Sequence, residues 1–227
     1  MDHKVTIAVF DVDETLIRCK SMFSFLDYAL AAKMGAAEGR RAYSALQAAI
    51  QQARASLPRE AVNRQFYKAF AGWNMEELRS LAIAWFRDHK SPDFYIPEAL
   101  ARFRFHQQQG HRTLLLSGSA TFILAPIAQD LRADDMLAIA LRHQASGMTD
   151  GEIEGSQTIG MGKAEALMRY LGQFDSAPHL VGYGDHESDL PFLNLCDRGY
   201  VVLPAQAPWP TWAKGLEPLP LSEAAPQ

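Results

Sequence analysis

Two aspartates separated by one residue, Asp11 and Asp13, follow an apolar and β-branched run from Val5 to Phe10. Such a run is typical of a strand that is buried on both faces, as in a parallel sheet. Open α/β sheets bind ligands at the carboxyl ends of their strands, so both carboxylates lie where a ligand is expected. Two close carboxylates repel each other unless a proton or a metal ion lies between them. The segment therefore predicts a Mg²⁺ site with one carboxylate free as a nucleophile, and a solvated acidic turn is the competing interpretation.

Two more apolar runs, at 113–116 and 179–183, also end in polar loops, and a lysine opens a helical segment between them. The polar residues concerned are Ser117, Gly118, Lys163, Asp185 and Asp189. Because the carboxyl ends of parallel strands share one edge of a sheet, we expect these groups to meet Asp11 and Asp13. Together they offer a carboxylate nucleophile, a second carboxylate for proton transfer, a third for a metal, and donors for charged oxygens. Phosphoryl transfer needs this combination of groups.

The elements that must position these residues alternate between strand and helix. From about Lys20 to Asp88 the composition is helical and predicts four helices, with the second from about Arg40 to Ser56. Strand and helix patterns then alternate, with short strands at 137–141 and 153–159 and the last clear strand at 200–203. The proline-rich tail from Pro204 is expected to lack regular structure. The pattern predicts an α/β fold with a helical insertion over the end of its first strand.

The composition excludes several classes of protein. A chain of 227 residues with 48% hydrophobic residues can bury a sizeable core. The net charge of −4, without a basic block, argues against nucleic-acid binding. Cys19 and Cys196 cannot form a disulfide framework, and we find neither a secretory signal nor a membrane span. We therefore expect a soluble cytoplasmic protein that acts on a small molecule, and its oligomeric state stays open.

Four ordered segments resemble the motifs of the haloacid dehalogenase (HAD) superfamily. They are Asp11-Val12-Asp13-Glu14-Thr15-Leu16, Leu115-Leu116-Ser117-Gly118-Ser119, Gly162-Lys163 and Gly184-Asp185-His186-Glu187-Ser188-Asp189-Leu190-Pro191. A helical insertion between the first two motifs resembles subfamily IB, the branch that contains phosphoserine phosphatase. The resemblance implies a Rossmann-like parallel sheet core formed by residues 1–19 and 89–227. It also implies a helical cap of the C1 type at residues 20–88.

The resemblance also implies a Mg²⁺-dependent phosphomonoesterase that hydrolyses a small phosphorylated metabolite. Asp11 would attack phosphorus and form an aspartyl phosphate. Asp13 would protonate the leaving oxygen and then activate water. Asp11, the backbone carbonyl of Asp13, and Asp185 would hold the metal.

The remaining motif residues would bind the phosphoryl group. Ser117 and the amide of Gly118 would contact its oxygens, and Lys163 would stabilise its charge and that of Asp11. Asp189 would hold Lys163 or a metal-bound water. Taken alone, Lys163 could instead be a solvated lysine, and Ser117 could merely cap the next helix.

The sequence departs from the phosphoserine phosphatases at Lys20, where those enzymes usually carry a glutamate that meets the substrate ammonium. The opposite charge argues against phosphoserine and favours a leaving group with a second anion, although a solvated Lys20 is an equal alternative. The insertion is expected to close as a lid over the substrate. Three other functions remain open: a phosphotransferase with the same aspartyl phosphate, a receiver-type signalling domain, and a binding protein on an inactive scaffold.

Overall fold

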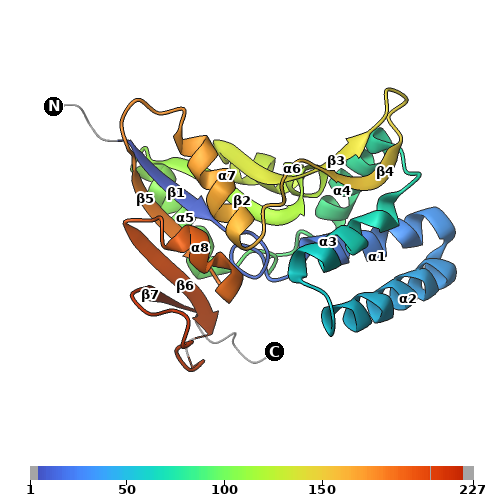
Figure 1. The fold of residues 1–227 in the computed structure, drawn as a ribbon, viewed down its shortest axis with the longest axis horizontal. Helices are drawn as coiled ribbons and strands as arrows, with labels where there is room; N and C mark the ends of the chain where they lie inside the picture. Colours follow the sequence, from blue (N-terminus) through green and yellow to red (C-terminus); the bar gives the residue numbers. More distant parts are fainter. Residues whose placement is uncertain (1–4, 205, 222–227) are drawn as a thin grey trace.

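The fold is built on a seven-stranded sheet, and the computed structural model describes residues 5–204 and 206–221 (Figure 1). The strands are β1 (Thr6–Phe10), β2 (Arg112–Ala120), β3 (Asp135–His143), β4 (Thr149–Glu154), β5 (His179–Gly184), β6 (Arg198–Pro204) and β7 (Glu217–Leu221). Their order is β4-β3-β2-β1-β5-β6-β7, and every pair is parallel except β3 with β4. The predicted α/β class with a mostly parallel sheet is confirmed.

Helices cover both faces of this sheet. In the core they are α5 (Pro97–Gln108), α6 (Thr121–Leu131), α7 (Met161–Leu171) and α8 (Leu190–Leu193), with the 3₁₀ turn η2 (Glu187–Asp189) before α8. One apolar cluster joins β1 and β2 to α7 and α8, and a larger one joins the other face to α5 and α6. The sheet is thus the middle layer of a sandwich.

Strand β1 lies at the centre because its side chains are apolar on both faces. Ile7 and Val9 are in the cluster with α7 and α8, whereas Ala8 and Phe10 are in the cluster with α5 and α6. The ring of Phe10 stacks on that of Tyr183 in β5, with 4.3 Å between centroids. The chain leaves β1 for β2 on one side and later returns to β5 on the other. The end of β1 is therefore a topological switch point, where such sheets bind ligands.

The inserted segment forms α1 (Ser21–Met34), α2 (Ala36–Arg54), α3 (Arg59–Tyr67), the 3₁₀ turn η1 (Lys68–Phe70) and α4 (Met75–His89). In Figure 1 its first three helices extend to one side of the sheet. Its aromatic core continues into the sheet domain, since the ring of Phe25 contacts that of Phe122 in α6. We keep residues 20–88 as the proposed cap.

A second connection ties this segment to the hairpin of β3 and β4. The amide of Gly72 donates to the carbonyl of Thr149, and the amide of Thr149 donates to the carbonyl of Trp73, at 2.8 and 2.9 Å. The amide of Met75 donates to the carbonyl of Gly147 at 2.9 Å. These main-chain bonds anchor this end of the segment to the sheet domain.

The structure corrects three sequence-based boundaries. The second helix begins at Ala36 rather than near Arg40, with Gly39 inside it, because α1 and α2 pack so closely that a Cβ on Gly39 would lie 2.6 Å from backbone atoms of Ala31. The strand expected at 153–159 is β4 at Thr149–Glu154. The tail after Pro204 was expected to be irregular but contains β7, a parallel edge strand on β6.

Candidate active site

The loop after β1 places the first carboxylate. The amide of Asp11 donates to the carbonyl of Tyr183 at 2.9 Å, which continues the pairing of β1 with β5, and the residue is 5% exposed. Glu14 then adopts a positive φ of 63°, a strained conformation for a residue with a side chain. The turn brings the Thr15 hydroxyl to Asp185, where Oγ1 donates to Oδ1 at 3.0 Å. The end of β1 is thereby joined to the end of β5.

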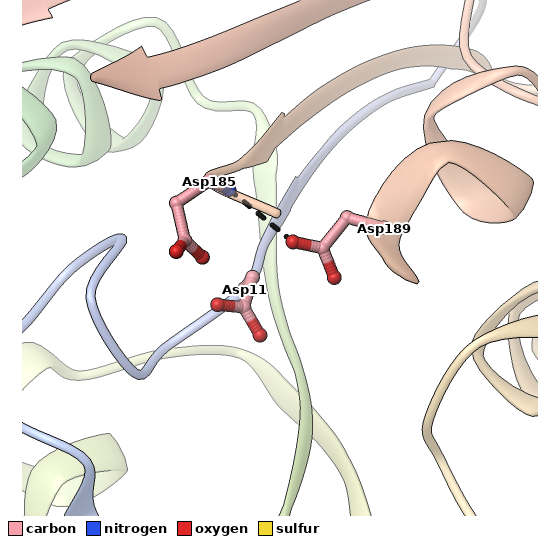
Figure 2. A group of neighbouring side chains, drawn as sticks. All are labelled: Asp11, Asp185 and Asp189. Atoms are coloured by element: carbon pink, nitrogen blue, oxygen red, sulfur yellow. Dashed lines mark hydrogen bonds between the residues drawn. The ribbon is translucent and has the colours of Figure 1, made fainter. Parts of the chain in front are cut away.

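Three carboxylates converge from β1, β5 and η2. Figure 2 shows Asp11, Asp185 and Asp189 turned toward a common space, and one oxygen of each lies within 4.8 Å of the others. Asp189 is fixed by the turn itself, because its Oδ2 accepts from the backbone amides of Asp185 and His186, both at 3.2 Å. Strand ends and a short turn thus concentrate negative charge at one point.

Lys163 lies among these carboxylates rather than in solvent. It is in the first turn of α7 and 4% exposed, with its Nζ 2.5 Å from Asp11 Oδ1 and 2.6 Å from Asp189 Oδ1. Burial alone would lower the pKa of Lys163, but the attraction of Asp11 and Asp189 outweighs it and raises that pKa. The solvated alternative is therefore wrong, and the lysine is a permanent cation beside Asp11.

The charge of this cluster is not balanced by protein. Three carboxylates and one ammonium sum to −2 when all are ionised. Burial, with the nearby Asp189, raises the pKa of Asp185 to about 6, and burial also raises the pKa of Asp11 despite Lys163. Buried, unbalanced carboxylate oxygens are ligands that a hard divalent cation prefers. The residues present therefore fit Mg²⁺, which Asp11, Asp185 and a further oxygen would hold.

Asp13 is held by a chain of hydroxyl groups. The Ser21 hydroxyl donates to Ser119 Oγ at 2.8 Å, and the Ser119 hydroxyl donates to Asp13 Oδ2 at 3.0 Å. Its other oxygen, Oδ1, is the one enclosed side-chain polar atom without a hydrogen-bond partner among the described residues. Burial raises the pKa of Asp13. A carboxyl whose protonated form is favoured by burial, and which lines the cavity, is suited to general acid–base work.

Residues 117–119, expected in a loop, are instead the last part of β2, and they face this carboxyl. Ser117 is 2% exposed, and its Oγ accepts from the amide of Ser119 at 3.1 Å. It does not cap α6, whose N-cap is Ala120. The Tyr67 hydroxyl donates to the Gly118 carbonyl at 3.0 Å. A Cβ at Gly118 would lie 2.3 Å from Cγ2 of Ile159, so this position requires glycine.

All the residues selected from the sequence line one cavity of about 390 Å³ between the sheet edge and the inserted helices. This volume suits a small molecule. Lys20 also lines the cavity, but its Nζ is 3.1 Å from Glu14 Oε2 and its side chain is 50% exposed.

Several lining or supporting residues have no role in the sequence-based site. Thr15 and Ser119 lie inside the recognised motifs, which is a signal that could have revealed them. Ser21, Tyr67 and Asn63 lie on inserted helices, and no spacing in the sequence relates them to the strand ends. Only the folded arrangement brings them to the site.

Comparisons with known proteins agree with this geometry. The family model of haloacid dehalogenase-like hydrolases matches residues 8–194. A histidinol-phosphatase of Neisseria meningitidis serogroup C is 25% identical over 219 residues, covering 87% of this chain and 90% of its own. A Bordetella pertussis Tohama I protein of unknown function has a similar structure, with a TM-score of 0.80 and 23% sequence identity. The match covers 95% of this chain and 98% of that chain. A structure of a phospho-aspartyl intermediate analogue of phosphoserine phosphatase is also similar, with a TM-score of 0.62 and 16% sequence identity. The match covers 88% of this chain and 87% of that chain.

The family match spans most of the chain and includes the three strand-end motifs and the lysine. The predicted superfamily, its fold and its hydrolase class are confirmed, and similarity to named phosphatases agrees with the predicted HAD-type phosphatase. The chain belongs to the haloacid dehalogenase-like hydrolase family.

Proposed function

We propose that this protein is a Mg²⁺-dependent phosphomonoesterase that works through an aspartyl phosphate on Asp11. The observation that carries the proposal is the convergence of Asp11, Lys163 and Asp185 in one cavity with Ser117 and Gly118 near the end of β2. The similarity to a histidinol-phosphatase supports the phosphatase class.

Asp11 is suited to be the nucleophile because its two oxygens have different surroundings. Oδ1 is held by Lys163, and Oδ2 is available to form a bond to phosphorus as the ester P–O bond breaks. Asp13 would give a proton to the departing oxygen, since burial raises the pKa of this carboxyl and it lines the same cavity. The same carboxylate would then take a proton from the water that attacks the aspartyl phosphate, which releases phosphate and restores Asp11.

The phosphoryl oxygens would be bound by the Ser117 hydroxyl, the Gly118 amide and the Lys163 ammonium. Asp11, the Asp13 carbonyl and Asp185 would hold Mg²⁺, which when bound neutralises charge on the phosphoryl oxygens and lets an anion attack an anion. Asp189 has one oxygen on Lys163 and the other on two backbone amides, so its role would be to position the lysine.

The substrate would be a small phosphorylated metabolite whose leaving group meets the inserted helices. Arg54 and Arg59 line the cavity there, and neither has an ion pair among the described residues. Arg59 Nη1 instead lies 3.0 Å from His186 Nδ1. With Lys20 at the same wall, this surface would favour a second anion on the leaving group. We also place the enzyme in the cytoplasm, where its free cysteines stay reduced.

The test is phosphate release from a panel of phosphorylated metabolites, histidinol phosphate included, with Mg²⁺ and with excess chelator. Matched variants are Asp11→Asn in the site and Asp175→Asn at an exposed carboxylate outside it. The proposal expects release that needs Mg²⁺, survives Asp175→Asn and disappears with Asp11→Asn. Added alcohols separate a phosphotransferase, which would form new phosphoesters. Turnover by Asp11→Asn within tenfold of the wild type would refute the assignment.

A further inference from the structure

Asn63, on the inner side of α3, is a buried polar residue that the proposed chemistry does not use. It is 8% exposed and lines the same cavity as Asp11. Val62 and Phe66 of the same helix also line the cavity and are apolar, whereas Arg59, one turn earlier, is charged. A buried polar group beside apolar side chains can contribute to binding selectivity, because its hydrogen bond is stronger where less water competes.

The hydrogen bonds around Asn63 determine which way its amide points. Gln157 Nε2 donates to the backbone carbonyl of Glu60 at 3.0 Å, and a carbonyl can only accept. Gln157 Oε1 must then face Asn63, and it accepts from Asn63 Nδ2 at 2.9 Å. The carboxamide of Asn63 is therefore oriented with its Oδ1 away from Gln157.

That oxygen has no hydrogen-bond partner among the described residues, and it is not enclosed by protein. Because Asn63 lines the cavity, we infer that the open side of Oδ1 faces it. The segment that carries Gln157 is itself connected to β2, since the Thr158 hydroxyl donates to the Ser117 carbonyl at 2.5 Å. The acceptor is thus held in place before any substrate binds.

We propose that Asn63 is a specificity-determining residue that accepts a hydrogen bond from a hydroxyl or amine group on the leaving group. The inference rests on the proposed phosphatase function and narrows its substrates to phosphoesters with such a donor. An analogue with a methyl group in place of the donor would leave Oδ1 dry and unpaired, which is the costly state for a polar atom.

The experiment compares three isosteric series of alkyl phosphates that end in a hydroxyl, an amine or a methyl group, at chain lengths from two to six carbons. The measured quantity is the ratio of kcat/KM for the donor-bearing ester to that for its methyl analogue. Using a ratio within one variant cancels any general loss of activity. The wild type should favour the donor by about tenfold for a hydroxyl at its best length, and by less for a charged amine, which meets the positive charge of Arg54 and Arg59.

Asn63→Leu should bring that ratio close to one, since leucine has a similar shape and no acceptor. Asn63→Asp keeps an acceptor at the same place and should preserve the preference for a donor. Because aspartate is negatively charged, the variant should also raise kcat/KM for the amine relative to that for the hydroxyl. Asn194→Leu makes the same change at an exposed site outside the cavity and should leave the ratio as in the wild type. If Asn63→Leu does not fold, Asn63→Asp still decides the question through the amine-to-hydroxyl ratio.

Equal kcat/KM for all three end groups at every length in the wild type would overturn the inference. An unchanged ratio in folded Asn63→Leu would also overturn it. Both results would leave phosphate release and its dependence on Asp11 intact, so they are distinguishable from a failure of the proposed function. Absence of release from every ester, and from 4-nitrophenyl phosphate, would instead count against the phosphatase itself.

Discussion

Asp185→Asn should make the metal-free protein more stable while removing its response to Mg²⁺. The pKa of Asp185 is raised to about 6, against an ordinary value of 3.8. At about 1.4 kcal/mol per pKa unit, this gap corresponds to about 3 kcal/mol. Because the folded pKa lies above the unfolded one, the folded state binds more protons between pH 4 and 6. Stability should therefore fall as pH rises through that range, and the full cost is present above about pH 6.

Asparagine is neutral at every pH and can still accept the hydrogen bond from Thr15. The quantity compared is the change in the free energy of unfolding of each protein between pH 4 and pH 7, measured in chelator. Over this range the wild type should lose about 3 kcal/mol more than Asp185→Asn. Mg²⁺ at about one hundred times its Kd should add about 2.7 kcal/mol to the wild type at pH 7 and much less to the variant. The wild-type gain should shrink toward pH 5, where the carboxyl binds a proton instead.

The assay is urea unfolding from pH 4 to pH 8, with chelator or with Mg²⁺, on the wild type, Asp185→Asn and the exposed control Asp175→Asn. The control should follow the wild type throughout. The reasoning fails if Asp185→Asn shows no gain in chelator above pH 6, or if it keeps the full stabilisation by Mg²⁺.

Three further outcomes test individual residues by steady-state kinetics. Asp11→Asn should lower kcat by about 10⁴-fold or more, because it removes a covalent nucleophile, and circular dichroism should show an unchanged fold. Ser119→Ala removes the hydrogen bond that the Ser119 hydroxyl donates to Asp13. It should lower kcat about tenfold more for alkyl phosphates than for 4-nitrophenyl phosphate, because only poor leaving groups need a proton from Asp13. Equal losses on both substrates would contradict this role. Lys20→Glu should lower kcat/KM about ten- to a hundredfold on a substrate with a second anion, and far less on 4-nitrophenyl phosphate. Equal losses on both substrates would show that Lys20 supports the site in general.

The sheet and the main site residues could be predicted because each depends on a local pattern. A two-sided apolar strand such as Thr6–Phe10 can be stable only inside a sheet, and this places Asp11 and Asp13 at its end. The same argument predicts the polar residues near the ends of β2 and β5, although β2 continues to Ala120 instead of ending at Leu116. Parallel strands then bring three short segments together without any further information.

The remaining features depend on contacts that the local sequence does not encode. Prolines at alternate positions of Glu217–Leu221 suggest a loop, but an edge strand needs amide donors on one side only, so β7 tolerates them. Gly39 suggests a break, but it serves a close crossing of α1 and α2. The pairing of Asn63 with Gln157 joins residues 94 positions apart, and it forms only when α3 lies over the segment before α7.

The central claim is that Asp11 carries the phosphoryl group, and trapping that intermediate tests it most directly. The enzyme is mixed with a ³²P-labelled phosphomonoester that it hydrolyses and is quenched in acid within milliseconds. The account predicts a protein-bound label that is stable in acid, is removed by hydroxylamine, maps to the peptide containing Asp11 and is absent from Asp11→Asn. Turnover at the full rate with no label on the protein at any quench time would mean that water attacks phosphorus directly, and the account would be wrong.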